Sequence, residues 1–460
     1  MGSDAPAGDA AYDEDRDRDG SPRAGYREAL AALCGADLDE LRAAVARHLQ
    51  RGGVRFGSEP FVVDPVPRLL AAAEWEPLAA GLAQRARALD ALVRDAYGER
   101  RIVRAGVLAD ETIEQAAGYE PELRGRLPEQ TALAAVIGFD VVRDPDGTFL
   151  VLEDNLRTPS GIAYAVAARR ALDDVLPAGM PPGRPVEPAA AELLAGALRA
   201  AAPPGRRDDP SIFVLSDGPE SVAWYEHAEV ARWLGAAVGT LADLVDDGER
   251  VLARLPDGST RPVDVVYRRT AEDCLRRPDG EPTADARALL EPWLAGRIGL
   301  VNPFGIGVAD DKFVHGFVED CIRFYLDEEP LVRSVPPRAI EGRPTPEGLR
   351  DVVVKPRDGY GGDGVVIGAH AERRDLERLA GEVAANPDHF IAQPLVMLSR
   401  HPTAIGGRLE PRHVDLRAFA FGAGDVALLP GGLTRVALDE GALVVNSSQH
   451  GGGKDTRILD

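Results

Sequence analysis

The segment GFDVVRDPDGTFLVLEDN, residues 138–155, limits the possible folds more than any other part of the chain. It consists of two apolar runs around the turn sequence DPDG, which predicts a β-hairpin. Apolar residues occupy both faces of each run, a pattern that is typical of strands covered on both sides. The hairpin is therefore expected to be buried.

The pairing of these two strands decides which side chains meet. A two-residue loop, Pro145–Asp146, would pair Asp140 with Val151, so Asp140 would share a face with Glu153 and Asn155. Two carboxylates and an amide oxygen in this arrangement suit Mg²⁺, which binds through one or two carboxylates plus substrate phosphates. The alternative is an exposed edge hairpin whose acidic side chains are solvated.

A glycine-rich loop lies at residues 352–366, VVVKPRDGYGGDGVV. GYGGDG matches the dinucleotide-binding pattern, but a strand rather than a helix follows it, so that fold is not expected. We expect a hairpin whose tip brings backbone N–H groups against phosphate oxygens. The alternative is an ordinary turn with an exposed lysine. The glycines of interest are Gly359, Gly361 and Gly362.

Lysine is scarce in this chain, because only three of its 53 basic residues are lysine. Against this bias toward arginine, a retained lysine suggests a site that needs a compact point charge. The three are Lys312, Lys355 and Lys454. Lys312 is expected just inside a helix, where a positive charge is unfavourable unless an anion compensates it, so we expect it to bind phosphate.

Several other charged residues are candidates. Asp415 and Arg417 share one face of the strand HVDLRAF, with Arg435 on a later strand; a buried arginine indicates a nearby anion, or simply pairing with the aspartate. Arg68 either lines a site or caps the next helix. Two further arginines follow the strand VDVVY and either clamp a substrate carboxylate or are surface charges: Arg268 and Arg269. The histidines His227 and His315 are expected on solvated helix faces.

The totals exclude several classes of protein. A net charge of -22 argues against a nucleic-acid partner. No run of about 18 apolar residues occurs, so no membrane span is expected. The three cysteines lie far apart without a metal-binding spacing, which favours a reducing cytoplasm. The sequence does not indicate an oligomeric state.

Taken together, these segments resemble the ATP-grasp superfamily, in the order of its circularly permuted branch related to glutathionylspermidine synthase-like proteins. Residues 138–155 are similar to the metal-binding strand pair that ends a standard ATP-grasp ligase such as D-alanine:D-alanine ligase, but here they precede the nucleotide segments. GVADDKFV and VVVKPRDGYGGDGVV resemble the two phosphate-lysine segments, FIAQPL the adenine-side hinge and HVDLRAF the phosphate-arginine strand.

The resemblance implies ATP and Mg²⁺ as cofactors and a role for each matched residue. The implied nucleotide ligands are Lys312, Lys355, Gly359, Gly361, Gly362, Gln393, Asp415 and Arg435. The implied magnesium ligands are Asp140, Glu153 and Asn155, and the implied catalytic residues are Arg417, Lys355 and Lys454. The ending SSQHGGGKDT departs from the family pattern, so Lys454 is expected to contact either the acyl substrate or a phosphate. Substrate contacts are expected from Arg68, Arg268 and Arg269.

The fold class expected is α/β (α+β), a circularly permuted ATP-grasp fold. The expected divisions are a disordered acidic tail at 1–24, a mainly helical segment at 25–128, the metal-binding strand pair at 129–180, an α/β substrate domain at 185–305 and the nucleotide-binding region at 306–460. The family resemblance implies ATP-dependent joining of a small-molecule or peptide carboxylate to an amine through an acyl phosphate. A phosphotransferase and a non-catalytic ATP-binding scaffold are the alternatives.

Overall fold

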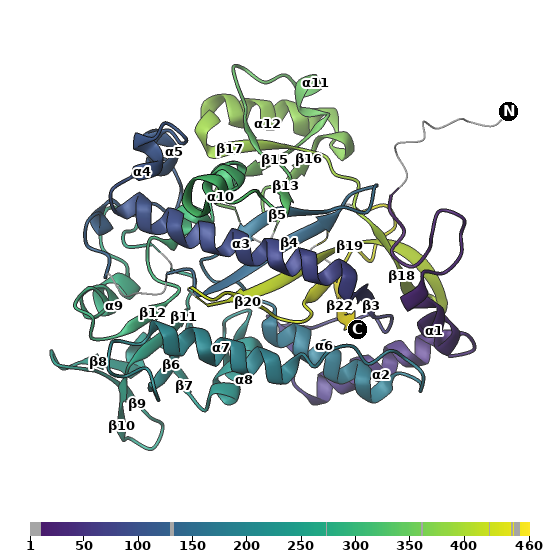
Figure 1. The fold of residues 1–460 in the computed structure, drawn as a ribbon, viewed down its shortest axis with the longest axis horizontal. Coiled ribbons are helices and arrows are strands. Elements are labelled where there is room, and N and C mark those ends of the chain that lie inside the picture. Colours follow the sequence, from purple (N-terminus) through teal and green to yellow (C-terminus); the bar gives the residue numbers. More distant parts are fainter. Residues whose placement is uncertain are drawn as a thin grey trace.

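A computed structural model describes residues 11–128, 133–272, 274–359, 362–422, 424–442, 445 and 451–460. Figure 1 shows a large twisted sheet with helices on both sides and a small lobe above it. None of the helices in these ranges combines the length and the apolar character needed to cross a membrane.

The central sheet joins strands from both ends of the chain. Its order is β13-β5-β4-β19-β21-β22-β3, with β18 and β20 also paired to β19. The strands are β3 (Arg68–Ala71), β4 (Val136–Arg143), β5 (Phe149–Asn155), β13 (Arg333–Ser334), β18 (Arg400–Ile405), β19 (Arg408–Phe421), β20 (Ala427–Leu428), β21 (Leu433–Val436) and β22 (Gly452–Leu459). The early hairpin β4–β5 thus lies beside the late strand β19, as the permuted order requires.

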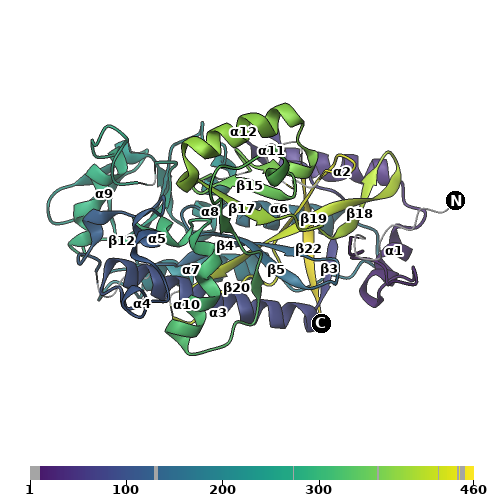
Figure 2. The same cartoon turned by 90° about the horizontal axis from the view of Figure 1, so that it is seen from above.

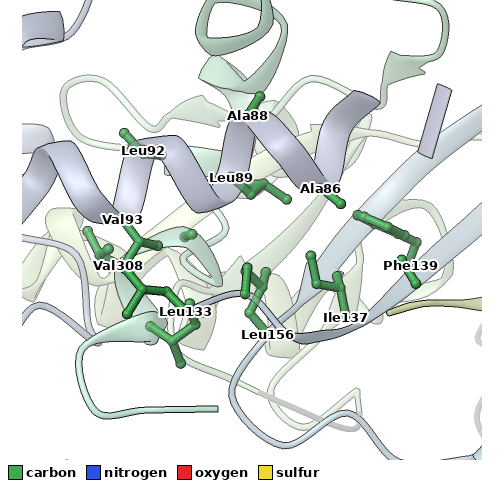
Figure 3. Close-up of a cluster of buried hydrophobic side chains, with 14 of the residues drawn as sticks. Ala86, Ala88, Leu89, Leu92, Val93, Leu133, Ile137, Phe139, Leu156 and Val308 are labelled. Carbon is green, nitrogen blue, oxygen red and sulfur yellow. The ribbon is translucent and has the colours of Figure 1, made fainter. Parts of the chain in front are cut away.

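Helices cover both faces of this sheet. Helix α3 (Ala72–Tyr97) crosses one face, and its apolar side chains recur every three or four residues, so that Leu89 packs near Ile137 and Phe139 of β4 (Figure 3). Helix α6 (Ile162–Val175) packs against β21 and β22 and against α2 (Leu38–Arg51). Every residue of β4 is buried, because the sheet is covered on both sides, and most of the strand is accordingly apolar.

A small sheet with the order β14-β17-β15-β16 lies to one side of the central sheet (Figures 1 and 2). Its elements are β14 (Arg338–Ala339), β15 (Val352–Pro356), β16 (Val366–Ile367) and β17 (Phe390–Pro394), with α11 (Pro346–Leu349) and α12 (Arg373–Ala385) packed on it. β15 and β16 are antiparallel. The expected glycine-rich hairpin is therefore confirmed.

A parallel sheet forms a third unit, with the order β12-β11-β6-β7. Its elements are β6 (Ile212–Ser216), β7 (Ala237–Gly239), β11 (Val265–Arg269) and β12 (Gly299–Val301), flanked by α7 (Glu187–Ala201), α8 (Trp224–Leu234) and α9 (Ala284–Leu294). A peripheral sheet adds β8 (Leu244–Asp246), β9 (Val251–Arg254) and β10 (Thr260–Val263). The other elements include α1 (Ala24–Leu33), α4 (Arg101–Arg104), α5 (Asp110–Glu114), α10 (Val318–Leu326) and the hairpin β1–β2 (Arg55–Phe56 and Glu59–Pro60).

The expected register of the β4–β5 hairpin is wrong. The turn has three residues, Pro145–Gly147, and its glycine adopts a φ of 85°, as such loops favour. Val151 therefore pairs with Val141, and a bulge next to Asp140 brings that aspartate opposite Glu153. Because directly opposed residues share a face, the two carboxylates still meet.

The expected solvated tail is also wrong for residues 11–24. Glu14 is 2% exposed and accepts a hydrogen bond from Arg68 at 2.5 Å and another from Arg143 at 3.1 Å. The backbone on either side of Asp13 pairs with Arg400 of β18: the Glu14 N–H donates to the Arg400 carbonyl oxygen, and the Arg400 N–H donates to that of Tyr12. A carboxylate can be buried when cations and hydrogen bonds neutralise it, and two arginines from the sheet do so here.

Candidate nucleotide and acceptor site

A cavity of about 120 Å³ lies between the central sheet and the small sheet, and we call it the inter-sheet cavity. Its walls are largely apolar and include Leu152, Val353, Val365, Ile367, Leu395 and Leu398. One end is charged and brings together many of the residues expected to form the site: Asp140, Glu153, Lys355, Gly362, Gln393, Asp415, Arg417 and Arg435. An apolar slot with a charged end suits a nucleotide, whose base is flat and whose phosphates are anionic.

Asp140 is held between two arginines. Arg417 contacts both of its carboxylate oxygens, from Nε at 2.7 Å and from Nη2 at 2.8 Å, and Arg435 adds a contact at 2.9 Å. Burial alone would raise the pKa of Asp140, but these guanidinium groups outweigh it and hold the pKa below the usual range. Arg435 also contacts Asp415. Burial raises the pKa of Asp415, although the charge of Arg435 acts to lower it.

Glu153 forms the corresponding pair with Lys355. Lys355 Nζ lies 2.9 Å from Glu153 Oε1, and the lysine is 5% exposed. Burial tends to raise the pKa of Glu153, but Lys355 and then Lys312 lower it to about 2, against the opposing charge of Asp140. The carboxylate is therefore ionised at neutral pH and able to accept a cation.

The glycine loop is tied to Lys312. The Lys312 ammonium donates to the carbonyl oxygen of Gly359. The Lys312 backbone N–H donates to the backbone carbonyl oxygen of Arg357 at 3.4 Å. The residue lies between two 3₁₀ segments, Ile306–Ala309 and Val314–Phe317, and not inside a helix as expected. Gly361 lies outside the described residues. The contact nonetheless places a phosphate-binding candidate against the loop expected to hold phosphates.

Gln393 lies on β17 at the boundary between the two sheets. Its Nε2 donates to the backbone oxygen of Val335 at 2.9 Å. Its Oε1 is buried without a hydrogen-bond partner among the described residues. An unused acceptor at this position is suited to an exocyclic amine such as that of adenine.

A second cavity, of about 360 Å³, lies beside the N-terminal end of α6, and we call it the α6 cavity. Its lining includes Asn155, Ser160, Tyr164, His227, Arg269 and Thr270. Arg417 and Arg435 line both cavities. The two arginines thus mark the place where a group bound in one cavity meets a group bound in the other.

Asp140, Glu153 and Asn155 on β4 and β5 fit a magnesium ion. Asp140 and Glu153 are opposed on neighbouring strands, and Asn155 Nδ2 donates to Gly138 at 3.1 Å, which leaves the amide oxygen for a cation. No cluster of three or more His, Cys, Asp or Glu side chains suited to a metal occurs in the described part of the chain. A bound Mg²⁺ would therefore rely on Asn155 and on phosphate oxygens in addition to the two carboxylates.

Three expected site residues lie elsewhere. Lys454 is fully buried on β22, where its ammonium contacts Asp64 and the backbone oxygens of Val66 and Pro402. Arg68 is occupied by the buried carboxylate of Glu14. Arg268 stacks over the ring of Phe304 at 4.7 Å and does not line the α6 cavity. The structure thus gives these three residues contacts in the interior, whereas Arg269 lines the cavity.

The two histidines expected on solvated faces are buried. His315 Nδ1 lies 2.7 Å from Asp154, which also accepts two hydrogen bonds from Arg85. His227 lies 2.7 Å from Ser216 Oγ and lines the α6 cavity. Nothing in the local sequence distinguishes a histidine on a solvated face of a helix from one that packs against a strand end, because the partners lie on other secondary-structure elements.

The chain belongs to the circularly permuted ATP-grasp type 2 family, whose model matches residues 67–437. Membership implies ATP binding, and the expected fold is confirmed. A Frankia alni protein named "Putative glutamate--cysteine ligase 2-3" is 42% identical over 467 residues, covering 98% of this chain and 54% of the relative. The chain therefore spans about half the length of that relative.

An uncharacterized protein of Mycobacterium leprae is 37% identical over 466 residues, covering 98% of this chain and 82% of the relative. Among solved structures, a glutathione synthetase-like effector from Globodera pallida, in its apo form, matches with a TM-score of 0.57 and 13% identity. The match covers 92% of this chain and 98% of the effector. At this identity the likeness concerns the fold alone.

Proposed function

We propose that the protein is an ATP-dependent carboxylate–amine ligase that forms an amide or peptide bond through an acyl phosphate. ATP would occupy the inter-sheet cavity, and the acid would occupy the α6 cavity. The observation that carries this proposal is that Arg417 and Arg435 line both cavities. Phosphoryl transfer requires donor and acceptor to approach within about 3–3.5 Å in line, so adjoining cavities that share cationic walls suit it.

Each residue of the site would have a role that follows from its position. Gln393 would accept from the adenine amine, and Lys312 and Lys355 would neutralise phosphate charge beside the glycine loop. Asp140, Glu153 and Asn155 would hold Mg²⁺, which when bound neutralises phosphate oxygens and aligns them for transfer. Arg417 would neutralise the charge that develops on the transferred phosphoryl group.

The proposed reaction has two steps. A carboxylate oxygen of the acid attacks the terminal phosphorus of ATP, and the bond between that phosphorus and the β-phosphate bridging oxygen breaks to release ADP. The amine nitrogen then attacks the acyl carbon, the bond to the phosphate breaks, and the nitrogen loses a proton. No side chain of the protein forms a covalent bond in either step.

Interception of the acyl phosphate tests the proposal. The protein is incubated with ATP, Mg²⁺, hydroxylamine and a library of carboxylic acids and small peptides. We expect one class of acid to yield a hydroxamate together with equal amounts of ADP and phosphate. The Arg417→Met variant serves as the matched control and is expected to yield none, and its circular dichroism spectrum is compared with that of the wild type to show that it is folded.

Other products would contradict the proposal. AMP and pyrophosphate would indicate adenylation. A stable phosphorylated product that hydroxylamine does not attack would indicate a phosphotransferase. ATP binding without turnover for any acid, with or without added amines, would indicate a binding scaffold.

A further inference from the structure

The α6 cavity has a polar end formed by the parallel sheet. Arg269 is the last residue of β11 and Ser216 the last of β6, so both lie at the carboxyl edge of this sheet. Ligand-binding residues of parallel sheets gather at that edge. The arginines shared with the inter-sheet cavity come instead from β19 and β21 of the central sheet.

Arg269 offers an unused donor to the α6 cavity. The residue is 6% exposed, and its Nη2 donates to Glu226 Oε1 at 3.1 Å. Its Nη1 is buried and has no hydrogen-bond partner among the described residues, although the residue lines the cavity. A buried guanidinium N–H without an acceptor is unfavourable, so an anionic ligand would stabilise this position.

His227 supplies a second donor to the same end. Ser216 Oγ accepts from the backbone N–H of Gly218 at 3.1 Å and lies 2.7 Å from His227 Nδ1. The serine hydroxyl finds an acceptor if it donates to Nδ1, which leaves the ring proton on Nε2. Burial, and then the charge of Arg269, lower the pKa of His227 to about 3, so the ring is neutral. Its Nε2–H is therefore a neutral donor.

Ser160 and Gly161, which precede α6, lie between this end and Arg417. Glu226 Oε2 accepts from the backbone of Gly161 at 2.8 Å, while Glu226 Oε1 accepts from Arg269. On the other side, Arg417 Nη1 donates to the backbone oxygen of Ser160 at 3.2 Å. An acid group bound at Arg269 is therefore distinct from the carboxylate that would react beside Arg417.

We propose that Arg269 and His227 bind a second carboxylate of the acid substrate, one that does not react. The substrate would then be a diacid, or a peptide with two carboxylates, whose reacting end lies at Arg417. Phe61 and Tyr164, with ring centroids 4.7 Å apart, line the cavity and would pack against the apolar part that joins the two ends. This inference rests on the proposed ligase function, since it assigns the α6 cavity to the acid.

Binding without turnover tests the subsite independently of the ligase reaction. Calorimetry is done with the full chain, Mg²⁺ and a non-hydrolysable ATP analogue, using succinate, glutarate and N-acetylglutamate. Each acid is compared with its half-amides, which remove one charge but keep the size. We expect at least one diacid to bind tenfold or more tightly than its half-amides. The Arg269→Gln variant is expected to lose this difference and to bind the ATP analogue normally.

Two further variants keep the test decisive. Arg268→Gln changes the neighbouring arginine of β11, which does not line the cavity, and should keep the preference for the diacid. His227→Phe removes the ring donor at similar size and should lose part of the preference even if Arg269→Gln does not fold. Equal binding of every diacid and its half-amides, or no binding of any acid, would overturn the subsite. So would an undiminished preference for the diacid in both Arg269→Gln and His227→Phe. A preference without hydroxamate formation would instead contradict the ligase function and leave the subsite standing.

Discussion

Each acidic side chain expected to bind Mg²⁺ contacts a basic side chain expected to bind phosphate. Asp140 pairs with Arg417 and Arg435, and Glu153 pairs with Lys355. These ion pairs balance the charges of the acidic and basic side chains. Mg²⁺ and a nucleotide that arrive together can exchange these partners, because the cation replaces the basic groups on the carboxylates while the phosphates replace the carboxylates. Either ligand alone would leave buried charges without partners.

Glu153→Gln tests this partner exchange. The variant is expected to lower turnover by about 10²-fold, the scale found when one electrostatic stabiliser is removed, and to require more Mg²⁺ for half-maximal rate. Steady-state rates over a Mg²⁺ titration measure both effects. The control is Asp146→Asn, a carboxylate lost at the exposed tip of the same hairpin. An unchanged Mg²⁺ titration in Glu153→Gln would remove this residue from the metal site.

Lys355→Arg tests whether the site needs a lysine rather than a positive charge. The lysine is buried beside Glu153, and a planar guanidinium needs more room and different directions for its donors. We expect turnover at saturating ATP to fall by about 10²-fold. Arg374→Lys, on a side chain 80% exposed in the same lobe, is the reverse control and should be neutral. Near-normal turnover of Lys355→Arg would show that charge alone suffices.

Lysine scarcity identified constrained positions but not the kind of constraint. Lys312 and Lys355 lie at the site, whereas Lys454 contacts Asp64 in the interior. A lysine is retained both where it forms a buried ion pair and where it binds phosphate, so its presence in the sequence does not distinguish the two cases. Only the fold reveals which partner is present, because Asp64 is 390 residues away in the chain.

At the scale of elements, local patterns predicted strands better than their pairing. The β4–β5 and β15–β16 hairpins follow from apolar runs and turn residues. The register of β4–β5 depended on one more residue in the turn and on a bulge, neither of which the apolar pattern specifies. The shared face of Asp140 and Glu153 was nevertheless correct, since the longer turn and the bulge together shift the pairing by two residues.

For the N-terminal segment, the composition predicted disorder where the structure is ordered. Residues 11–24 have the composition of a disordered tail, yet Glu14 is buried against Arg68 and Arg143. Composition describes a segment in isolation, and here the countercharges come from β3 and β4. The segment is therefore ordered by its partners.

Glu14→Gln should accordingly destabilise the fold. The change leaves two buried arginines without their common carboxylate, and breaking a buried pair typically costs about 3–5 kcal/mol. Urea denaturation measures the loss. The control is Asp13→Asn, which removes the neighbouring carboxylate. That side chain is 45% exposed and contacts Arg400 at 3.4 Å. A loss below that of the control would show that the segment contributes little, as the composition suggested.

At the scale of the whole molecule, the site is assembled from distant parts of the chain. Asp140 and Glu153 come from the first third, Lys355 from the small sheet, and Arg417 and Arg435 from the last strands. The sequence predicted this set because a family resemblance supplied the order of the segments. It did not predict the α6 cavity, which forms where the parallel sheet and α6 meet.

The interleaved central sheet has a consequence for synthesis on the ribosome. The hairpin β4–β5 precedes its neighbour β19 by a long stretch of chain, because β5 ends at Asn155 and β19 begins at Arg408. A nascent chain must therefore carry an apolar hairpin with an open edge until β19 has been made, and open edges of this kind promote association between chains. Chaperone contact with the hairpin during translation would protect it until β19 arrives, and a ribosome-bound chain that stops before β19 should contain no ATP site.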